Sequence, residues 1–129
     1  MPTEAEWEFA ARGGNKSKGY IYSGSNNLDN VGWYDNNSGG GTKPVGQKQP
    51  NELGIYDMSG NVYEYCSDWW KEYSSVAVTN PTGPSTGDYR VVRGGYWDTG
   101  DRSCRVVYRY SDGFPLSGRN SGFRVVFDK

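Results

Sequence analysis

The chain has 129 residues, with 14 Lys and Arg against 15 Asp and Glu, so its net charge is −1. This balance offers no electrostatic basis for binding nucleic acid or an anionic membrane. No apolar run approaches the ~20 residues of a membrane-spanning helix. Because histidine is absent, Ser-His-Asp and Cys-His catalysis and His-ligated zinc or iron centres are excluded. We therefore expect a soluble domain without nucleic-acid partners or membrane insertion.

Glycine and aromatic residues dominate the composition. There are 19 glycines, and aromatic residues make up 16% of a chain whose apolar total is only 34%. Such a chain cannot build large amphipathic helices, but it can pack Trp and Tyr rings between loops. The length is that of one domain with one core. We expect a single loop-rich α+β domain over residues 1–129.

The N-terminus predicts a helix over residues 4–12. Thr3 and Glu6 have the spacing of a capping box, in which each side chain bonds the other residue's backbone N–H. Gly13 and Gly14 then provide the stop. Residues 15–54 read as mostly loop, because Asn and Gly clusters interrupt every periodic pattern. Strands are expected over residues 61–70, 89–93, 105–109 and 122–127, which are rich in aromatic or β-branched residues.

Four segments resemble, in order and spacing, the formylglycine-generating-enzyme (sulfatase-modifying factor) family. They are residues 2–14 (PTEAEWEFAARGG), 50–70 (PNELGIYDMSGNVYEYCSDWW), 90–97 (RVVRGGYW) and 122–126 (GFRVV). The resemblance implies a C-type-lectin-like fold of the formylglycine-generating-enzyme subtype. It also implies that the chain corresponds to roughly the C-terminal half of a full family enzyme.

The family oxidises a substrate cysteine with copper held by two cysteines in the segment after the Gly-Gly pair. A Cu(I) ion needs both thiolates. Here Cys104 matches the second cysteine, but Thr99 stands at the first position, so we expect no copper and no oxidase activity. A related iron-dependent branch of the family uses His ligands, which this chain lacks. Cys66 and Cys104 are either a disulfide or two buried thiols.

The resemblance also implies calcium, as a structural ion. Two carboxylates and backbone carbonyls in a Gly-containing turn suit a hard cation. The residues that match the family's ligands are Asp57, Gly60, Val62 and Glu64; the alternative is that the two acids only cap turns. A second family site would map to Asn30, Val31, Asn37 and Gly39, where no acidic side chain is present.

The last third of the chain has a restricted residue alphabet. Residues 1–95 contain fifteen Lys, Glu, Gln or Met, whereas residues 96–126 contain none. Between framework-like positions lie sixteen residues, here called the variable set, whose codons can all be reached from AAC by changing its two adenines. The set is Tyr96, Asp98, Thr99, Gly100, Arg102, Ser103, Val107, Tyr110, Ser111, Asp112, Gly113, Phe114, Leu116, Ser117, Asn120 and Ser121.

This pattern resembles the variable proteins of diversity-generating retroelements, whose reverse transcriptase mutates template adenines. Tyr, Ser, Gly, Asp and Asn are also the residues of antibody paratopes, where Tyr gives rigid contact area and small polar residues adapt. We therefore expect a non-catalytic, receptor-like domain of bacterial or phage origin that binds a protein or other macromolecular ligand through residues 96–121. It would be displayed on a cell surface or virion as part of a larger protein.

Two alternatives remain at this point. One is a divergent oxidase of the same family. The other is a calcium-dependent carbohydrate-binding lectin, although the Glu-Pro-Asn and Gln-Pro-Asp tripeptides typical of such lectins are absent.

Overall fold

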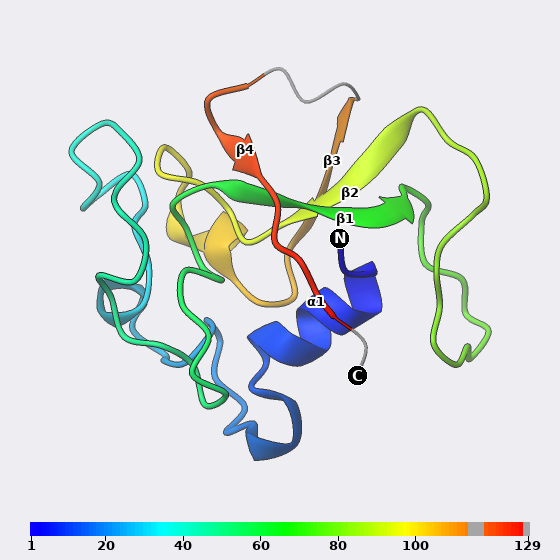
Figure 1. Ribbon diagram of the computed structural model, residues 1–129, viewed down its shortest axis with the longest axis horizontal. Coiled ribbons are helices and arrows are strands. Elements are labelled where there is room, and N and C mark those ends of the chain that lie inside the picture. The colour runs from blue at the N-terminus through cyan, green and yellow to red at the C-terminus, as the bar shows by residue number, and fades with distance from the viewer. Residues whose placement is uncertain (114–117, 128–129) are drawn as a thin grey trace.

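The computed structural model describes residues 1–113 and 118–127 (Figure 1). Their helices and strands are α1 (Glu4–Ala11), the 3-10 helices η1 (Gly14–Lys16), η2 (Leu28–Asn30) and η3 (Asp101–Cys104), and the strands β1 (Tyr63–Trp69), β2 (Tyr89–Arg93), β3 (Arg109–Gly113) and β4 (Ser121–Gly122). The predicted loop-rich α+β class is confirmed. None of the helices within the described ranges is long and apolar enough to cross a membrane.

The strands form a sheet in the order β3-β2-β1-β4. Strand β2 is antiparallel to both β1 and β3, whereas β4 joins the far edge of β1 in parallel. The register aligns Tyr65 with Val92 and Val92 with Tyr110, so these three side chains lie on one face of the sheet. Cys66 and Val91 alternate with them and point to the opposite face.

Helix α1 covers that opposite face (Figure 1). The capping box at its start is confirmed, since Thr3 Oγ1 accepts from the Glu6 N–H and the Glu6 carboxylate accepts from the Thr3 N–H. Trp7 points from the helix to the sheet, and its Nε1 donates to Glu64 Oε2 at 2.6 Å. The core between helix and sheet consists of Trp7, Ala11, Met58, Cys66, Val91 and Val106.

A buried arginine ties the helix to the sheet. The side chain of Arg93 is 0% exposed, and its guanidinium lies 4.9 Å from the centre of the Trp7 ring. It pairs with Glu4 at 3.2 Å and with Glu8, and both terminal nitrogens donate to the Val106 carbonyl at 3.0 and 3.1 Å. Since each charge has a partner, burial of this group does not leave an uncompensated ion.

The long connection before β1 is mostly loop, as predicted, and folds around a second core cluster. Its members are Tyr22, Leu28, Val31, Tyr34 and Cys104. Gly60 allows the backbone to pass close to Trp33, next to this cluster. The φ of Gly60 is +82°, and a Cβ there would lie 2.2 Å from the Trp33 carbonyl oxygen, so only glycine fits.

Two predicted strands are wrong. Residues 105–108 form a turn after η3, closed by the Tyr108 N–H bonding the Arg105 carbonyl, and β3 begins only at Arg109. The cause is Arg93, which takes the Val106 and Tyr108 carbonyls as acceptors in place of a neighbouring strand. The predicted strand over residues 122–127 is reduced to the two residues of β4, because residues 123–127 pair with no strand among those described.

Candidate ligand-binding surface

The variable set lies at the surface. Phe114, Leu116 and Ser117 fall outside the described residues. Of the other thirteen, none is fully buried, and the most exposed are Asp98, Gly100, Arg102, Val107 and Tyr110. Framework-like positions in the same stretch differ among themselves, since Cys104 is buried and Arg105 is exposed.

Two tyrosines of β1 form the floor beneath the variable set. Tyr63 is 9% exposed and Tyr65 is 1% exposed, and both pack on Val92. The ring of Tyr110 stacks on Tyr63 with 5.7 Å between centroids and 9° between planes. The ring of Tyr96 lies 5.0 Å from the same Tyr63 ring, tilted by 52°. Two tyrosines of the variable set therefore pack on one tyrosine of β1. Tyr63 and Tyr65 together are here called the tyrosine floor.

Polar members of the set gather around the same floor. The hydroxyl of Tyr65 donates to Asp112 Oδ2 at 2.9 Å. Ser121 pairs with Tyr63 across β4 and β1, and the Tyr63 N–H donates to the Asn120 carbonyl at 2.7 Å. Segments 96–99, 110–113 and 120–121, which are separate in sequence, therefore meet at β1.

Burial shapes the chemistry of the floor. Burial, aided by the Asp112 carboxylate and despite the Ser121 hydroxyl, raises the pKa of Tyr65 to about 12. The pKa of Tyr63 is also raised, by burial first and then by the phenols around it. Both rings stay neutral at physiological pH, and they offer aromatic surface in place of an acid or base.

Not every member of the set shares this face. Ser111 pairs with Val91, whose side chain belongs to the core under α1, so Ser111 points away from Tyr110. Thr99 is held by a turn: its Oγ1 donates to the Tyr96 carbonyl at 2.9 Å and accepts from the Tyr96 N–H at 3.1 Å. The hydroxyl of Thr99 therefore fixes Tyr96 as well as lying near the surface.

Thr99 also lies beside the remaining family cysteine. Its Oγ1 is 3.8 Å from Cys104 Sγ, which places it where a second thiol would have to stand. Burial raises the pKa of the Cys104 thiol to about 12, although its hydrogen bond with the Thr99 hydroxyl acts in the opposite direction. Cys66 lies in the other core cluster with its pKa raised by burial. Both cysteines are free thiols, so of the two sequence-based alternatives the buried-thiol one holds.

The first expected calcium loop fits a cation only in part. Asp57 Oδ2 accepts from the Gly46 N–H at 2.7 Å, while its Oδ1 is buried without a partner among the described residues, as a metal ligand would be. Glu64, however, is bonded by Trp7 and by Arg124, whose Nε lies 2.6 Å from Glu64 Oε2. The guanidinium already supplies the compensating charge, so a calcium ion here would depend mainly on Asp57 and the carbonyls of Gly60 and Val62.

At the second expected calcium site, several of the polar atoms already make hydrogen bonds within the protein. Asn37 Oδ1 accepts from the Tyr34 N–H at 2.9 Å, and its amide donates to Asp29 Oδ1 and the Gly32 carbonyl. The Asn30 carbonyl accepts from the Gln49 N–H, and Val31 is buried in the second core cluster. Calcium there stays a prediction that rests on the resemblance.

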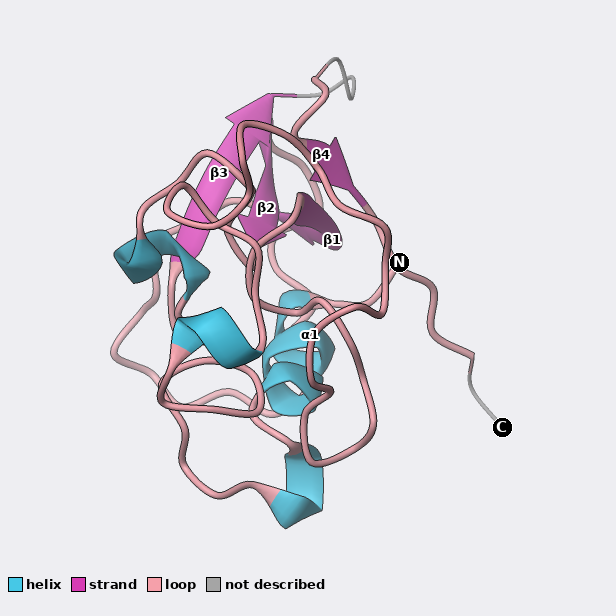
Figure 2. Cartoon of the chain, turned by 90° about the vertical axis from the view of Figure 1, so that its left-hand side faces the viewer, coloured by secondary structure: helices cyan, strands magenta, loops and turns pink. Residues whose placement is uncertain are grey.

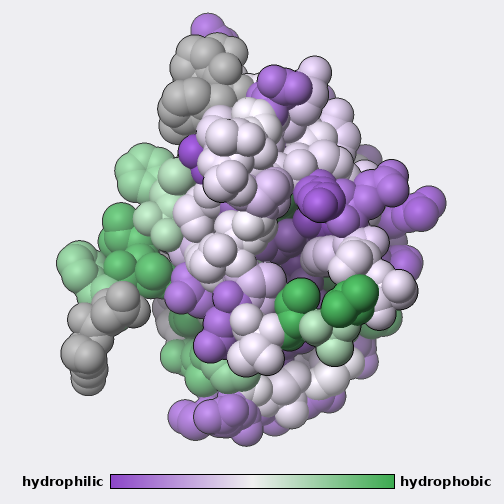
Figure 3. All heavy atoms as spheres, turned by 90° about the vertical axis from the view of Figure 1, so that its right-hand side faces the viewer, coloured by the Kyte–Doolittle hydropathy of each residue, from purple (hydrophilic) through white to green (hydrophobic). Residues whose placement is uncertain are grey.

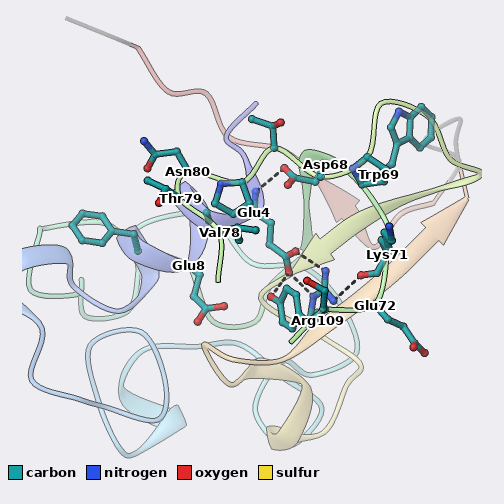
Figure 4. A pocket seen from close by; sticks show the side chains of 18 of the residues that line it. Glu4, Glu8, Asp68, Trp69, Lys71, Glu72, Val78, Thr79, Asn80 and Arg109 are labelled. Atoms are coloured by element: carbon teal, nitrogen blue, oxygen red, sulfur yellow. Dashed lines mark hydrogen bonds and ion pairs between the residues drawn. The ribbon is translucent and has the colours of Figure 1, made fainter. Parts of the chain in front are cut away.

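A hollow of about 810 Å³ lies between α1 and the loop that follows β1 (Figure 4). Its polar floor is internally paired: Arg109 bonds both oxygens of Glu4 at 2.7 and 2.6 Å, and Asp68 Oδ2 accepts from the Glu4 N–H at 2.8 Å. None of the thirteen described members of the variable set lines it. The hollow therefore belongs to the framework side of the molecule.

The model of the sulfatase-modifying factor enzyme 1-like domain family matches residues 1–129. The chain belongs to this family. Its relatives include the Paenibacillus barcinonensis chaperone protein LppX (40% identical, over all of this chain and 49% of LppX) and the Streptomyces coelicolor formylglycine-generating enzyme (38%, over 99% of this chain and 46% of the enzyme). The solved Treponema denticola variable protein 1 is 39% identical with a TM-score of 0.87, covering 95% of this chain and 45% of that one.

The chain thus spans about half the length of these relatives. The resemblance read from the four sequence segments is confirmed, and so is the likeness to variable proteins. The sequence predicted the variable set as the binding surface, which stays a prediction, and it did not assign Tyr63 and Tyr65 to that surface. Their two-residue spacing, which predicted the strand, also places them on one face, and that signal was sufficient to find them.

Proposed function

We propose that this domain is a non-catalytic binding module that presents a variable surface, built on the tyrosine floor, to a protein or other macromolecular ligand. The observation that carries the proposal is the packing of two rings on Tyr63, with Tyr110 stacked on it and Tyr96 tilted against it. Strand β1, which contains Tyr63, pairs with both β2 and β4, so the partly buried Tyr96 ring and the exposed Tyr110 ring are oriented before any ligand arrives. Such preorganisation lowers the entropic cost of binding.

The mixture of groups also suits recognition. Tyr110 is 49% exposed, and the variable set also contains the exposed Asp98 and Arg102, which carry opposite charges. Rigid aromatic anchors with adaptable charged and small residues around them are typical of protein-binding sites.

The test of binding is a selection experiment on the folded domain. A display library carrying NNC codons (any base, any base, C) at the described positions of the variable set is selected against lysozyme as a probe protein. A control library carries the same codons at thirteen positions of the exposed loop 71–84. Saturable lysozyme binders should arise from the first library and not from the second. Binders from both at equal frequency, or from neither, would contradict a specialised surface.

We further propose that the surface is diversified by a retroelement. The absence of Lys, Glu, Gln and Met from residues 96–126 and the likeness to Treponema denticola variable protein 1 support this. The test is genomic. A reverse-transcriptase gene should lie nearby with a near-copy of codons 91–126 that has AAC at the variable positions. A locus without such a copy would end the diversification proposal and leave the binding proposal standing.

An oxidase is the second candidate, because relatives of this chain are formylglycine-generating enzymes. Against it, the residue beside Cys104 Sγ is Thr99, and burial keeps that thiol protonated. A Cu(I) titration separates the candidates: an oxidase must bind one equivalent of Cu(I), lose that binding in Cys104→Ser, and oxidise a substrate cysteine.

For the lectin alternative, the corresponding test is calcium-dependent binding on a glycan array. As part of a larger protein, the module would be displayed on a cell surface or virion.

A further inference from the structure

Arg90 of β2 lies outside the variable set but on the same face of the sheet. In the register of β2 and β3, Arg90 pairs with Asp112. Two residues further along β2, Val92 pairs with Tyr110. Figure 2 shows β1, β2 and β3 side by side, with β2 in the middle. Since alternate residues of a strand share a face, Arg90 lies on the face that carries Tyr110 and the tyrosine floor.

The guanidinium of Arg90 is held in one orientation. Its central carbon lies 3.5 Å from the centre of the Trp69 ring, and its Nη1 donates to the Ser67 carbonyl. Trp69 is itself confined, because the backbone of Gly87 packs so closely that a Cβ there would lie 2.9 Å from the Trp69 Cβ. Stacking uses the flat face of a guanidinium and leaves its N–H groups free in the plane. Arg90 is therefore a donor that is positioned before a ligand arrives.

Most donors of this guanidinium have no acceptor. A guanidinium carries five N–H groups, and within the described ranges only the Ser67 carbonyl accepts from Arg90. Its Nε is buried without a partner among the described residues, while Arg90 as a whole is partly exposed. A partly desolvated cation of this kind gains more from a charged acceptor than a cation in open water does.

No acidic side chain among the described residues neutralises Arg90. Three acids lie near it in the chain or across the sheet, namely Asp68, Asp88 and Asp112. The Asp68 carboxylate accepts a backbone N–H of α1 at 2.8 Å, and Asp112 accepts a hydroxyl of the tyrosine floor at 2.9 Å. Asp88 is exposed just before β2, where solvent ions screen it. The charge of Arg90 is thus available to a ligand, although Asp112 opposes an approaching acid.

The variable set cannot build this stacked pair itself. Trp has no codon that ends in C, so a position limited to such codons never becomes Trp. Arg90 and Trp69 also precede residues 96–121, so the proposed diversification leaves them unchanged. Figure 3 looks onto the end of the molecule where β1 ends and β2 begins, and most of the surface there is hydrophilic. A fixed cation at this end offers every variant one contact of the same kind.

We propose that Arg90, stacked on Trp69, is a fixed subsite of the binding surface and binds a carboxylate from an acidic side chain of the protein ligand. This proposal rests on the binding function proposed above and adds the chemistry of one ligand group to it. Residue 112, which faces Arg90 across the strands, sets the strength of the contact. Asp at this position competes for the charge, whereas a neutral residue leaves the charge to the ligand.

The test uses one probe protein in two charge states. The display library with NNC codons at the described positions of the variable set is selected against lysozyme and against succinylated lysozyme, whose ammonium groups have become carboxylates. Arg90→Gln is then introduced into the binders. It should weaken binding to succinylated lysozyme about 10-fold or more and change binding to lysozyme less than about 2-fold. Retained binding to lysozyme shows that the variant is folded.

Two further variants separate charge from geometry. Arg12→Gln removes the same charge from a side chain that is 44% exposed on α1, across the sheet from the variable face, and should change neither affinity. Arg90→Lys keeps the charge but loses the planar stack, so it should recover only part of the affinity for succinylated lysozyme. If Arg90→Gln fails to fold, Arg90→Lys takes its place, and a loss for succinylated lysozyme alone is again the expected result.

Residue 112 provides an independent readout. In binders of succinylated lysozyme that carry a neutral residue at position 112, replacing that residue with Asp should weaken binding. The loss should be smaller once Arg90→Gln is present, with a coupling between the two positions of about 3-fold or more. Additive effects would contradict the role of residue 112.

The outcomes distinguish this proposal from the binding function. Equal effects of Arg90→Gln on both probes, or no effect on either, would show that Arg90 only supports β1 through the Ser67 carbonyl. Binders against lysozyme alone would leave the binding function standing and overturn the acid-binding subsite. If neither probe selects binders, the binding function itself fails, and the subsite fails with it.

Discussion

The rings of Tyr63 and Tyr110 lie 5.7 Å apart and within 9° of parallel. One residue belongs to a strand in the middle of the sheet, and the other to the edge strand that carries part of the variable set. The pair joins a nearly buried residue, 9% exposed, to a residue of the proposed variable set that is 49% exposed. That asymmetry yields the first prediction.

Removing the Tyr63 ring should cost far more than removing the Tyr110 ring. Tyr63→Ala deletes a nearly buried ring and is expected to lower the free energy of unfolding by about 3–5 kcal/mol. Tyr110→Ala, at a half-exposed position, should cost about 0.5–1.5 kcal/mol. Urea unfolding of the variants measures both. Tyr63→Phe keeps the ring and should stay within about 1 kcal/mol of the parent, and equal costs for the two alanine variants would contradict the floor.

The Thr99–Cys104 contact gives a gain-of-function prediction. Because Thr99 Oγ1 is 3.8 Å from Cys104 Sγ, Thr99→Cys should create a two-thiolate site that binds one Cu(I). The parent chain and the matched Thr99→Ser variant should bind none tightly. Competition with a chromophoric Cu(I) chelator measures the affinity. Tight Cu(I) binding by the parent would instead support the oxidase candidate.

Both thiols should be unreactive in the folded protein. Burial raises the pKa of Cys104 to about 12 and raises that of Cys66 as well, and only a thiolate attacks an alkylating agent. At pH 8, iodoacetamide should modify neither cysteine in buffer and both in 6 M guanidinium chloride, as read by mass spectrometry. Fast modification of Cys104 in buffer would mean that its site is open.

The ion pairs under α1 make stability depend on pH. Although burial opposes it, pairing with Arg93 and Arg12 lowers the pKa of Glu8. The contribution of Glu8 is therefore complete above the unfolded-state pKa, about 4.3, and is lost as pH falls through the lower folded-state value. Glu8→Gln should cost about 1.5–3 kcal/mol at pH 7 and less at pH 3. Glu72→Gln, at an exposed acid, is the control and should show no such pH dependence.

Calcium should have a small effect carried by Asp57. With Glu64 paired to Arg124, the expected ligand set has one free carboxylate, and such a low charge favours dissociation constants near the weak end, about 10⁻⁴–10⁻³ M. Millimolar calcium should therefore raise the melting temperature over that in chelator. Asp57→Asn, chosen because Asn tolerates the φ of +58° at this position, should remove the difference. Equal melting temperatures of the parent with and without calcium would contradict the prediction that this loop binds calcium.

The sequence predicted most where short-range chemistry decides the structure. The capping box of α1 and the strand over Tyr89–Arg93 both follow from neighbouring residues, whereas the expectation that Thr99 replaces the first family cysteine came from the resemblance. Prediction failed where a distant side chain intervened: Arg93 takes the carbonyls of residues 106 and 108 and so prevents a strand there. The proposed site was predicted as a set of positions in the chain. The two-residue spacing of Tyr63 and Tyr65 places them on one face of β1, but their position beside Tyr110 depends on the pairing of β1 and β3 with β2, which no local pattern shows.

The central claim is that an exchangeable surface rests on a fixed tyrosine floor, and a map of which substitutions residues 60–127 tolerate tests it most directly. Every residue from 60 to 127 is replaced by all others, and folded variants are sorted by surface display and protease resistance. We predict broad tolerance at Tyr96, Asp98, Arg102, Tyr110 and Asp112, and strong restriction at Tyr63, Tyr65, Val92 and Arg93. Equal restriction at the two groups of positions, or tolerance at Tyr63 and Tyr65, would contradict the account.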